Sequence, residues 1–164
     1  MTMSTRVTAV AMSGLGVVGL GTGSAAAEVG DGGMVALSSV YRACDFTPSA
    51  YVNATGFGSG HVFIGTGGTD TVTADVHLAI GRPNTPYQVR LIQGPRPGSQ
   101  KCNAGDPGVV SGVLNTDGNG TGAVTIRDAQ RPGATTAWVF IEGPPDFGQI
   151  RGEFYTSDVL TKLK

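Results

Sequence analysis

The chain has 164 residues, of which 14% are charged and 7% aromatic, with 27 glycines and a formal net charge of −1. This length fits one domain. The hydrophobic fraction of 40% is too high for a disordered chain, so a packed core is expected. Few charges and many glycines favour strands and turns over helices. Because the chain has no run of Lys and Arg, nucleic acid is not an expected partner.

Residues 1–27 have the order of a secretory signal peptide. A short start with one positive charge, at Arg6, precedes an uncharged apolar stretch and then small residues up to Ala27. This order predicts cleavage after Ala27 and a secreted protein, extracellular or in the cell envelope, with no membrane span after cleavage. A retained membrane anchor is the alternative, although five glycines between Gly14 and Gly23 weaken a spanning helix.

After a Gly-rich lead-in at 28–34, one β-domain is predicted over residues 35–158, followed by a tail at 159–164. Short segments rich in Val, Thr, Ile and aromatic residues alternate with Gly, Pro, Asn and Asp, which is typical of strands and turns. Ser157–Lys164 are expected to form a frayed helical turn or to trail. The expected strands are Val35–Ala43, Ala50–Thr55, His61–Gly65, Thr71–Ile80, Tyr87–Gln93, Val109–Asn115, Gly122–Arg127, Thr135–Glu142 and Gln149–Thr156.

Strict alternation of apolar and mostly polar side chains predicts that Thr71–Ile80 is a strand with one buried and one solvent-exposed face. Its inward set is Val72, Ala74, Val76, Leu78 and Ile80. Tyr87–Gln93 repeats the pattern, and a turn joins the two segments. They are expected to form a hairpin that places Arg90 opposite His77 or Asp75.

Thr135–Glu142 is apolar on both faces, which indicates a central strand. Trp138 is therefore expected in the core, and an exposed aromatic patch is the alternative. The side chains that could form a binding surface on the sheet faces are Asp75, His77, Arg90 and Trp138.

Cys44 and Cys102 have only each other as partners within an exported chain, so a structural disulfide is expected. It closes a loop of about 58 residues, which the chain-entropy model values at roughly 4 kcal/mol. The connection over 94–108 is long for a compact domain. Because it contains Cys102, the disulfide would hold it in place.

The stretch from Asp117 to Asp128 allows two interpretations. Asp117, Asn119, Thr121 and Asp128 supply oxygen ligands at positions 1, 3, 5 and 12 of a calcium loop, and Gly122 stands at the sixth position. Against calcium, the loop has only two carboxylates and no flanking helices. A hairpin turn at Asp-Gly-Asn-Gly explains the same residues.

His61 and His77 are the two histidines of the chain. A copper or zinc site needs at least three converging ligands, and no His-x-His pair exists. His77 beside Asp75 is the remaining basis for a small hydrolase. No G-x-S-x-G elbow accompanies them.

Nine short strands separated by turns predict an all-β, two-sheet antiparallel sandwich of about seven to nine strands. Through its segment Val76–Leu91, its Thr-Asp-Gly-Asn-Gly-Thr-Gly turn and its late Phe154-Tyr155 strand, the chain resembles small secreted bacterial proteins with immunoglobulin-like sandwiches. The resemblance implies that fold and no particular ligand.

The functional expectation is a non-catalytic extracellular module that binds a protein or a cell-envelope component through a sheet face or the 94–108 loop, without a cofactor. The alternatives are a protein that binds calcium or another metal through Asp117–Asp128, and a small secreted hydrolase.

Overall fold

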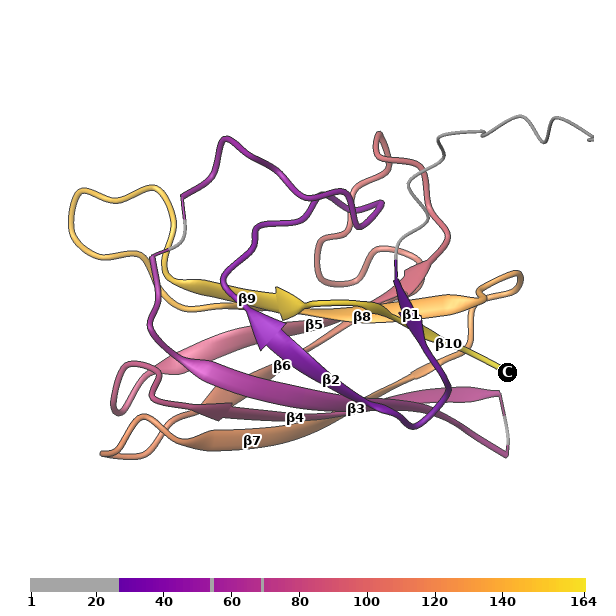
Figure 1. Ribbon diagram of the computed structural model, residues 1–164, viewed down its shortest axis with the longest axis horizontal. Coiled ribbons are helices and arrows are strands. Elements are labelled where there is room, and N and C mark those ends of the chain that lie inside the picture. Colours follow the sequence, from indigo (N-terminus) through magenta and orange to yellow (C-terminus); the bar gives the residue numbers. More distant parts are fainter. Residues whose placement is uncertain (1–26, 54, 69) are drawn as a thin grey trace, which may run out of the picture.

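The computed structural model describes residues 27–53, 55–68 and 70–164, so the predicted signal peptide lies outside it except for Ala27 (Figure 1). The described part is all-β and contains no helix, and therefore none that is long and apolar enough to cross a membrane. The strands are β1 (Glu28–Val29), β2 (Met34–Ser38), β3 (Ser59–Gly67), β4 (Thr71–Ala79), β5 (Pro86–Gly94), β6 (Val109–Asn115), β7 (Gly122–Ala129), β8 (Thr136–Glu142), β9 (Phe154–Ser157) and β10 (Leu160–Lys162).

Hydrogen bonding joins these ten strands into one mixed sheet that is not closed. The order runs β6–β5–β8, continues through β9, which pairs with β8 and β2, and ends with β3–β4–β7. β10 shares with β9 the second edge of β8, and β1 adds to β10 in parallel. The edge strands β6 and β7 lie against each other without pairing.

The sheet folds over, so that one half, with β5, β8 and β9, faces another half, with β3, β4 and β7 (Figure 1). The main core lies between the halves. Ile80, expected on the inner face, is 67% exposed, because β4 ends at Ala79 and Ile80 enters a turn with φ of 60°. The rest of the predicted alternation is confirmed, with exposures of 1% or less at Val72, Ala74, Val76, Leu78, Tyr87, Val89 and Leu91.

The predicted hairpin between β4 and β5 is wrong. β4 pairs with β3 and β7, whereas β5 pairs with β6 and β8, and residues 80–85 carry the chain from one half to the other. Arg90 therefore lies opposite Phe140, not opposite His77 or Asp75. Alternation reveals which face of a strand is buried, but it is the same for a hairpin and for a crossing between halves.

Two of the other differences from the sequence-based expectation lie in the β2–β3 connection and at the C-terminal segment. The described residues of the predicted strand Ala50–Thr55 belong to the long connection between β2 and β3. The C-terminal segment, expected to be a helical turn or a tail, forms β10 because Thr161 and Lys162 pair with β8. Both differences arise from tertiary contacts, which override weak local preference.

A second apolar cluster covers the outer face of β5 and β8. Trp138 is 1% exposed and Phe140 2%, and the ring of Phe46 meets Trp138 edge-on at 5.5 Å. The predictions of a central strand and of a buried Trp138 are confirmed. The cover consists of residues 39–49 and 95–108, called the loop cap below (Figure 1).

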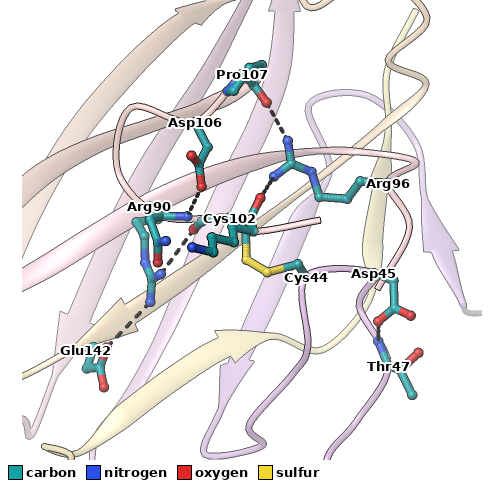
Figure 2. The surroundings of a disulfide bond; sticks show 11 residues. Cys44, Asp45, Thr47, Arg90, Arg96, Cys102, Asp106, Pro107 and Glu142 are labelled. Atoms are coloured by element: carbon teal, nitrogen blue, oxygen red, sulfur yellow. Dashed lines mark hydrogen bonds and ion pairs between the residues drawn. A yellow bond between two sulfur atoms is a disulfide. The ribbon is translucent and has the colours of Figure 1, made fainter. Parts of the chain in front are cut away.

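The predicted disulfide between Cys44 and Cys102 joins the two parts of the loop cap (Figure 2). Arg90 donates a hydrogen bond to the carbonyl oxygen of Cys102 at 3.1 Å, and its guanidinium lies 4.3 Å above the Phe140 ring. Burial lowers the pKa of Arg90, and nearby Glu142 opposes this shift. Arg96 donates to carbonyls of residues 101 and 107. The disulfide thus ties the long loop to residues 39–49, Arg90 of β5 holds it to the sheet, and Arg96 links residues within the loop itself.

We expect the double variant Cys44→Ser/Cys102→Ser to lose up to about 4 kcal/mol of unfolding free energy, because the disulfide restricts the unfolded chain. Urea denaturation of the variant and the native protein measures this loss. A reducing agent should lower the midpoint of the native protein and leave that of the variant unchanged. Equal midpoints without reductant would contradict the role assigned to the bond.

Candidate functional site

Four large apolar side chains project into solvent from two loops at one end of the molecule. Tyr51 and Phe57 are 98% and 95% exposed, and Phe147 and Ile150 are 108% and 96% exposed. These four residues are called the apolar edge below. Single exposed apolar residues are ordinary, but four that pack against nothing at one end point to a contact surface.

The two loops lie side by side in Figure 1 and contact each other. The hydroxyl of Thr55 donates to the carbonyl oxygen of Gly152 at 3.4 Å. The N–H of Gly58 donates to the phenol oxygen of Tyr155 at 2.9 Å. Gly56 lies so close to this phenol that an added Cβ would come within 2.3 Å of its oxygen. Residues 55–58, at the base of the first loop, are therefore bonded to β9 and to Gly152, which lies just before β9.

Tyr155 is completely buried beneath this contact. Burial raises the pKa of its phenol to about 12, and the hydrogen bond from Gly58 opposes the shift. A second buried phenol, that of Tyr87, accepts a hydrogen bond from the N–H of Arg82 at 2.7 Å. Two tyrosines thus support the loops at this end from inside the domain.

The cations next to the apolar edge are paired with acids. The guanidinium of Arg82 binds the carboxylate of Asp146, and Arg151 lies 3.5 Å from Glu142. Arg151 also stacks over the Tyr41 ring at 4.5 Å. The edge therefore presents apolar side chains without a dominant charge of either sign.

A second surface lies on the solvent face of β3, β4 and β7, where no loop covers the sheet (Figure 1). His61 lies directly opposite His77, and their rings stack at 4.8 Å with an interplanar angle of 12°. Asp75 Oδ2 is 3.4 Å from His77 Nε2, and Asp75 Oδ1 accepts a hydrogen bond from the Thr125 hydroxyl at 3.0 Å. The two histidines converge, which sequence periodicity could not reveal because it does not give the register of β3 against β4.

A hollow of about 510 Å³ lies beside the histidine pair. Small side chains at Ser59, Ala79 and Ala123 leave this space open. Among the described residues no serine or threonine hydroxyl donates to either imidazole, so the pair is not joined to a nucleophile. Nor does any group of three or more His, Cys, Asp or Glu side chains in the described ranges have the placement of a metal site.

The stretch proposed as a calcium loop is divided between two places. Asp117 Oδ1 accepts hydrogen bonds from the N–H groups of Asn119 and Thr121, at 2.8 and 2.9 Å, and closes a turn. Asp128 lies at the far end of β7, about 20 Å further along the strand, where it accepts from Gln93. The structure does not bring the first and last predicted ligands together. The turn is present, but β6 and β7 on either side of it do not pair.

The proposed binding surface made of Asp75, His77, Arg90 and Trp138 is also divided. Asp75 and His77 lie together on the open face of β4. Arg90 and Trp138 lie on the opposite side of the domain, beneath the loop cap. Trp138 is too deeply buried to contact a partner.

The apolar edge was not identified from the sequence. Tyr51 and Ile150 fall within predicted strands, where apolar residues are expected inside. The usable signal was an aromatic residue between turn formers, as in Gly56-Phe57-Gly58 and Asp146-Phe147-Gly148. An aromatic side chain at such a position has little neighbouring structure to cover it.

The chain matches no family model, and neither the comparison with curated proteins nor that with solved structures gives a significant match. The contacts described above therefore carry the functional argument.

Replacing Tyr155 with Phe should lower the unfolding free energy by about 1 kcal/mol, because the Gly58 N–H loses its acceptor. The difference in unfolding free energy between the native protein and the variant should be fully present below pH 10, the ordinary pKa of tyrosine. It should shrink as the pH rises to about 12, the raised pKa of Tyr155. Chemical denaturation at several pH values measures it. Tyr51→Phe, at a 98% exposed site, is the matched control and should change nothing. A constant gap up to pH 12 would contradict the assigned burial of the phenol.

Asp117→Ala should lower the melting temperature at neutral pH, because two N–H groups lose their acceptor. These N–H groups, of Thr121 and then Asn119, hold the pKa of Asp117 below its ordinary 3.8. The contribution is thus present above that value and lost as the pH falls through the lowered pKa. Asp117→Asn keeps an acceptor oxygen, so it separates the contribution of the hydrogen bonds to stability from the contribution of the negative charge. Calorimetric melts that show the same difference at pH 2 and pH 7 would oppose this account.

Proposed function

We propose that the protein is a secreted, non-catalytic binding module that attaches to a component of the cell envelope through its apolar edge. The observation that carries the proposal is the exposure, between 95% and 108%, of Tyr51, Phe57, Phe147 and Ile150. Leaving such side chains in water costs free energy that a bound partner would recover.

The anchoring of the loops supports a binding role. Gly58 at the base of the first loop is held by Tyr155, and the second loop is bonded by Arg82 through Asp146 and Pro144, while the four edge side chains are almost fully exposed. A fixed base limits the ordering cost that flexible loops incur on binding. Binding residues in general occur on loops positioned by a rigid scaffold, as here.

The disulfide supports export, since such bonds persist in oxidising compartments. In this proposal residues 1–27 act as the signal peptide. The proposal includes an immunoglobulin-like sandwich, which the apolar core between the two halves of the sheet supports. The ends of such sandwiches, where the loops gather, are common binding sites.

The other candidate functions receive less support. His77 and Asp75 interact, but the hydroxyl of Thr125 donates to Asp75 and not to the imidazole. Asp117 and Asp128 lie at opposite ends of β7. The 95–108 loop, an expected contact segment, is held down over the aromatic cluster by the disulfide and by Arg90. The apolar edge is the surface whose large apolar side chains stay exposed to solvent without a role in the fold.

Sedimentation with isolated bacterial envelope fractions tests the proposal. The native protein should pellet with the envelope, and the quadruple variant with Ser at positions 51, 57, 147 and 150 should remain in solution. Met34→Ser is the matched control, since Met34 is 62% exposed but lies on β2, away from the edge. Equal pelleting of native protein and quadruple variant, or no pelleting of either, would reject the apolar edge as the attachment surface.

A further inference from the structure

We propose that the envelope component recognised by the apolar edge is the surface of a lipid bilayer. This inference rests on the proposed binding role of the same four residues. It assigns them an interfacial position, with the rings and Ile150 among the headgroups and upper acyl chains. It does not require any segment of the described chain to cross the membrane.

The isolation of the four side chains favours lipid over a folded protein partner. Stable protein interfaces bury about 800 Å² on each partner in a contiguous, closely packed patch. Aromatic side chains offer about 150–250 Å² each, so three of them and one isoleucine provide on the order of 600–900 Å², split between two loops. This area is close to the protein threshold, but it is contributed by four separately projecting side chains on two loops. A fluid bilayer accepts each side chain separately and needs no complementary shape.

The residue types fit the membrane interface. Phe57, Phe147 and Ile150 are wholly apolar, whereas Tyr51 combines an apolar ring with a polar hydroxyl. Aromatic rings with a polar tip concentrate at the level of lipid headgroups. The same side chains at the tips of loops can enter the bilayer without moving the strands behind them.

The charges at this end predict which lipids are needed. Arg82 and Arg151 are paired with Asp146 and Glu142, so no free basic cluster is available for anionic headgroups. Binding should therefore occur on zwitterionic phosphatidylcholine and should depend little on salt. A polybasic surface would behave in the opposite way.

The distribution of apolar side chains along the molecule gives an orientation. The edge lies at the end where β4 and β8 finish, and Ile80 adds a further exposed side chain there. At the other end, near the C-terminus in Figure 1, the described turn residues at 30–33, 70 and 130–135 include no large exposed hydrophobic side chain, and Met34, 62% exposed, follows them at the start of β2. The domain would stand end-on, with its histidine pair in water.

Vesicles of phosphatidylcholine provide the first test, with the purified secreted protein after intact mass has determined whether residues 1–27 remain. The partition coefficient of the native protein should fall about ten-fold for Phe147→Ser and further for the quadruple variant. Met34→Ser should partition like the native protein. If the native protein and the quadruple variant partition equally, or if neither binds, the inference is overturned.

Tryptophan quenching provides a second and independent test. Phe147→Trp places a fluorophore at a 108% exposed site, while the native Trp138, 1% exposed, supplies an internal reference. Lipids brominated in the upper acyl chain should quench the introduced residue and leave the native protein's fluorescence unchanged. Quenching equal to that in the native protein would place position 147 outside the bilayer and reject the inference.

Envelope fractions extracted with organic solvent separate this inference from the proposed function. If lipid is the partner, extraction should abolish edge-dependent pelleting. Pelleting that persists after extraction and is lost in the quadruple variant would retain the binding role but assign it to a protein or wall polymer. Failure of edge-dependent pelleting before extraction would remove both.

Discussion

The structure depends on the burial of both faces of β8. Its side chains are apolar on each side, so one half of the sheet cannot be stable with only the other half packed against it. The second face is covered by irregular chain, and irregular chain that covers a core must be held there. The disulfide and Arg90 provide that restraint, and Arg96 links residues within the covering loop. The long loop and the two cysteines are thus consequences of one doubly buried strand.

This constraint also determines which surfaces are available. The loop cap covers Trp138 and Phe140, and its backbone carbonyls accept hydrogen bonds from Arg90 beneath it and from its own Arg96. The edge strands β6 and β7 lie against each other. Two of the surfaces that stay exposed are the open face bearing the histidine pair and the loop end bearing the apolar edge. Of these two, the apolar edge is the one whose side chains are unfavourable in water, whereas water can form hydrogen bonds with the histidines and Asp75.

The sequence predicted features that depend on local pattern or on compartment. Alternation identified the inward residues of β4 and β5, apolar residues on both faces identified β8 as central, and the two cysteines, with export expected, identified the disulfide. It did not predict partners in space. The crossing at 80–85 and the stacking of His61 on His77 depend on which strands are neighbours and in which register. Tyr51 was misplaced because an apolar residue in a strand-like segment and one on a loop tip have the same local signal.

Hydrogen–deuterium exchange with and without envelope fractions tests the central claim, that the apolar edge contacts the partner while the loop cap serves the fold. The account predicts protection confined to the peptides covering 50–58 and 143–152. The 95–108 segment, already held by the disulfide, should exchange at the same rate in both states. Protection of 95–108 or of the β3–β4 face, with 143–152 unchanged, would contradict it.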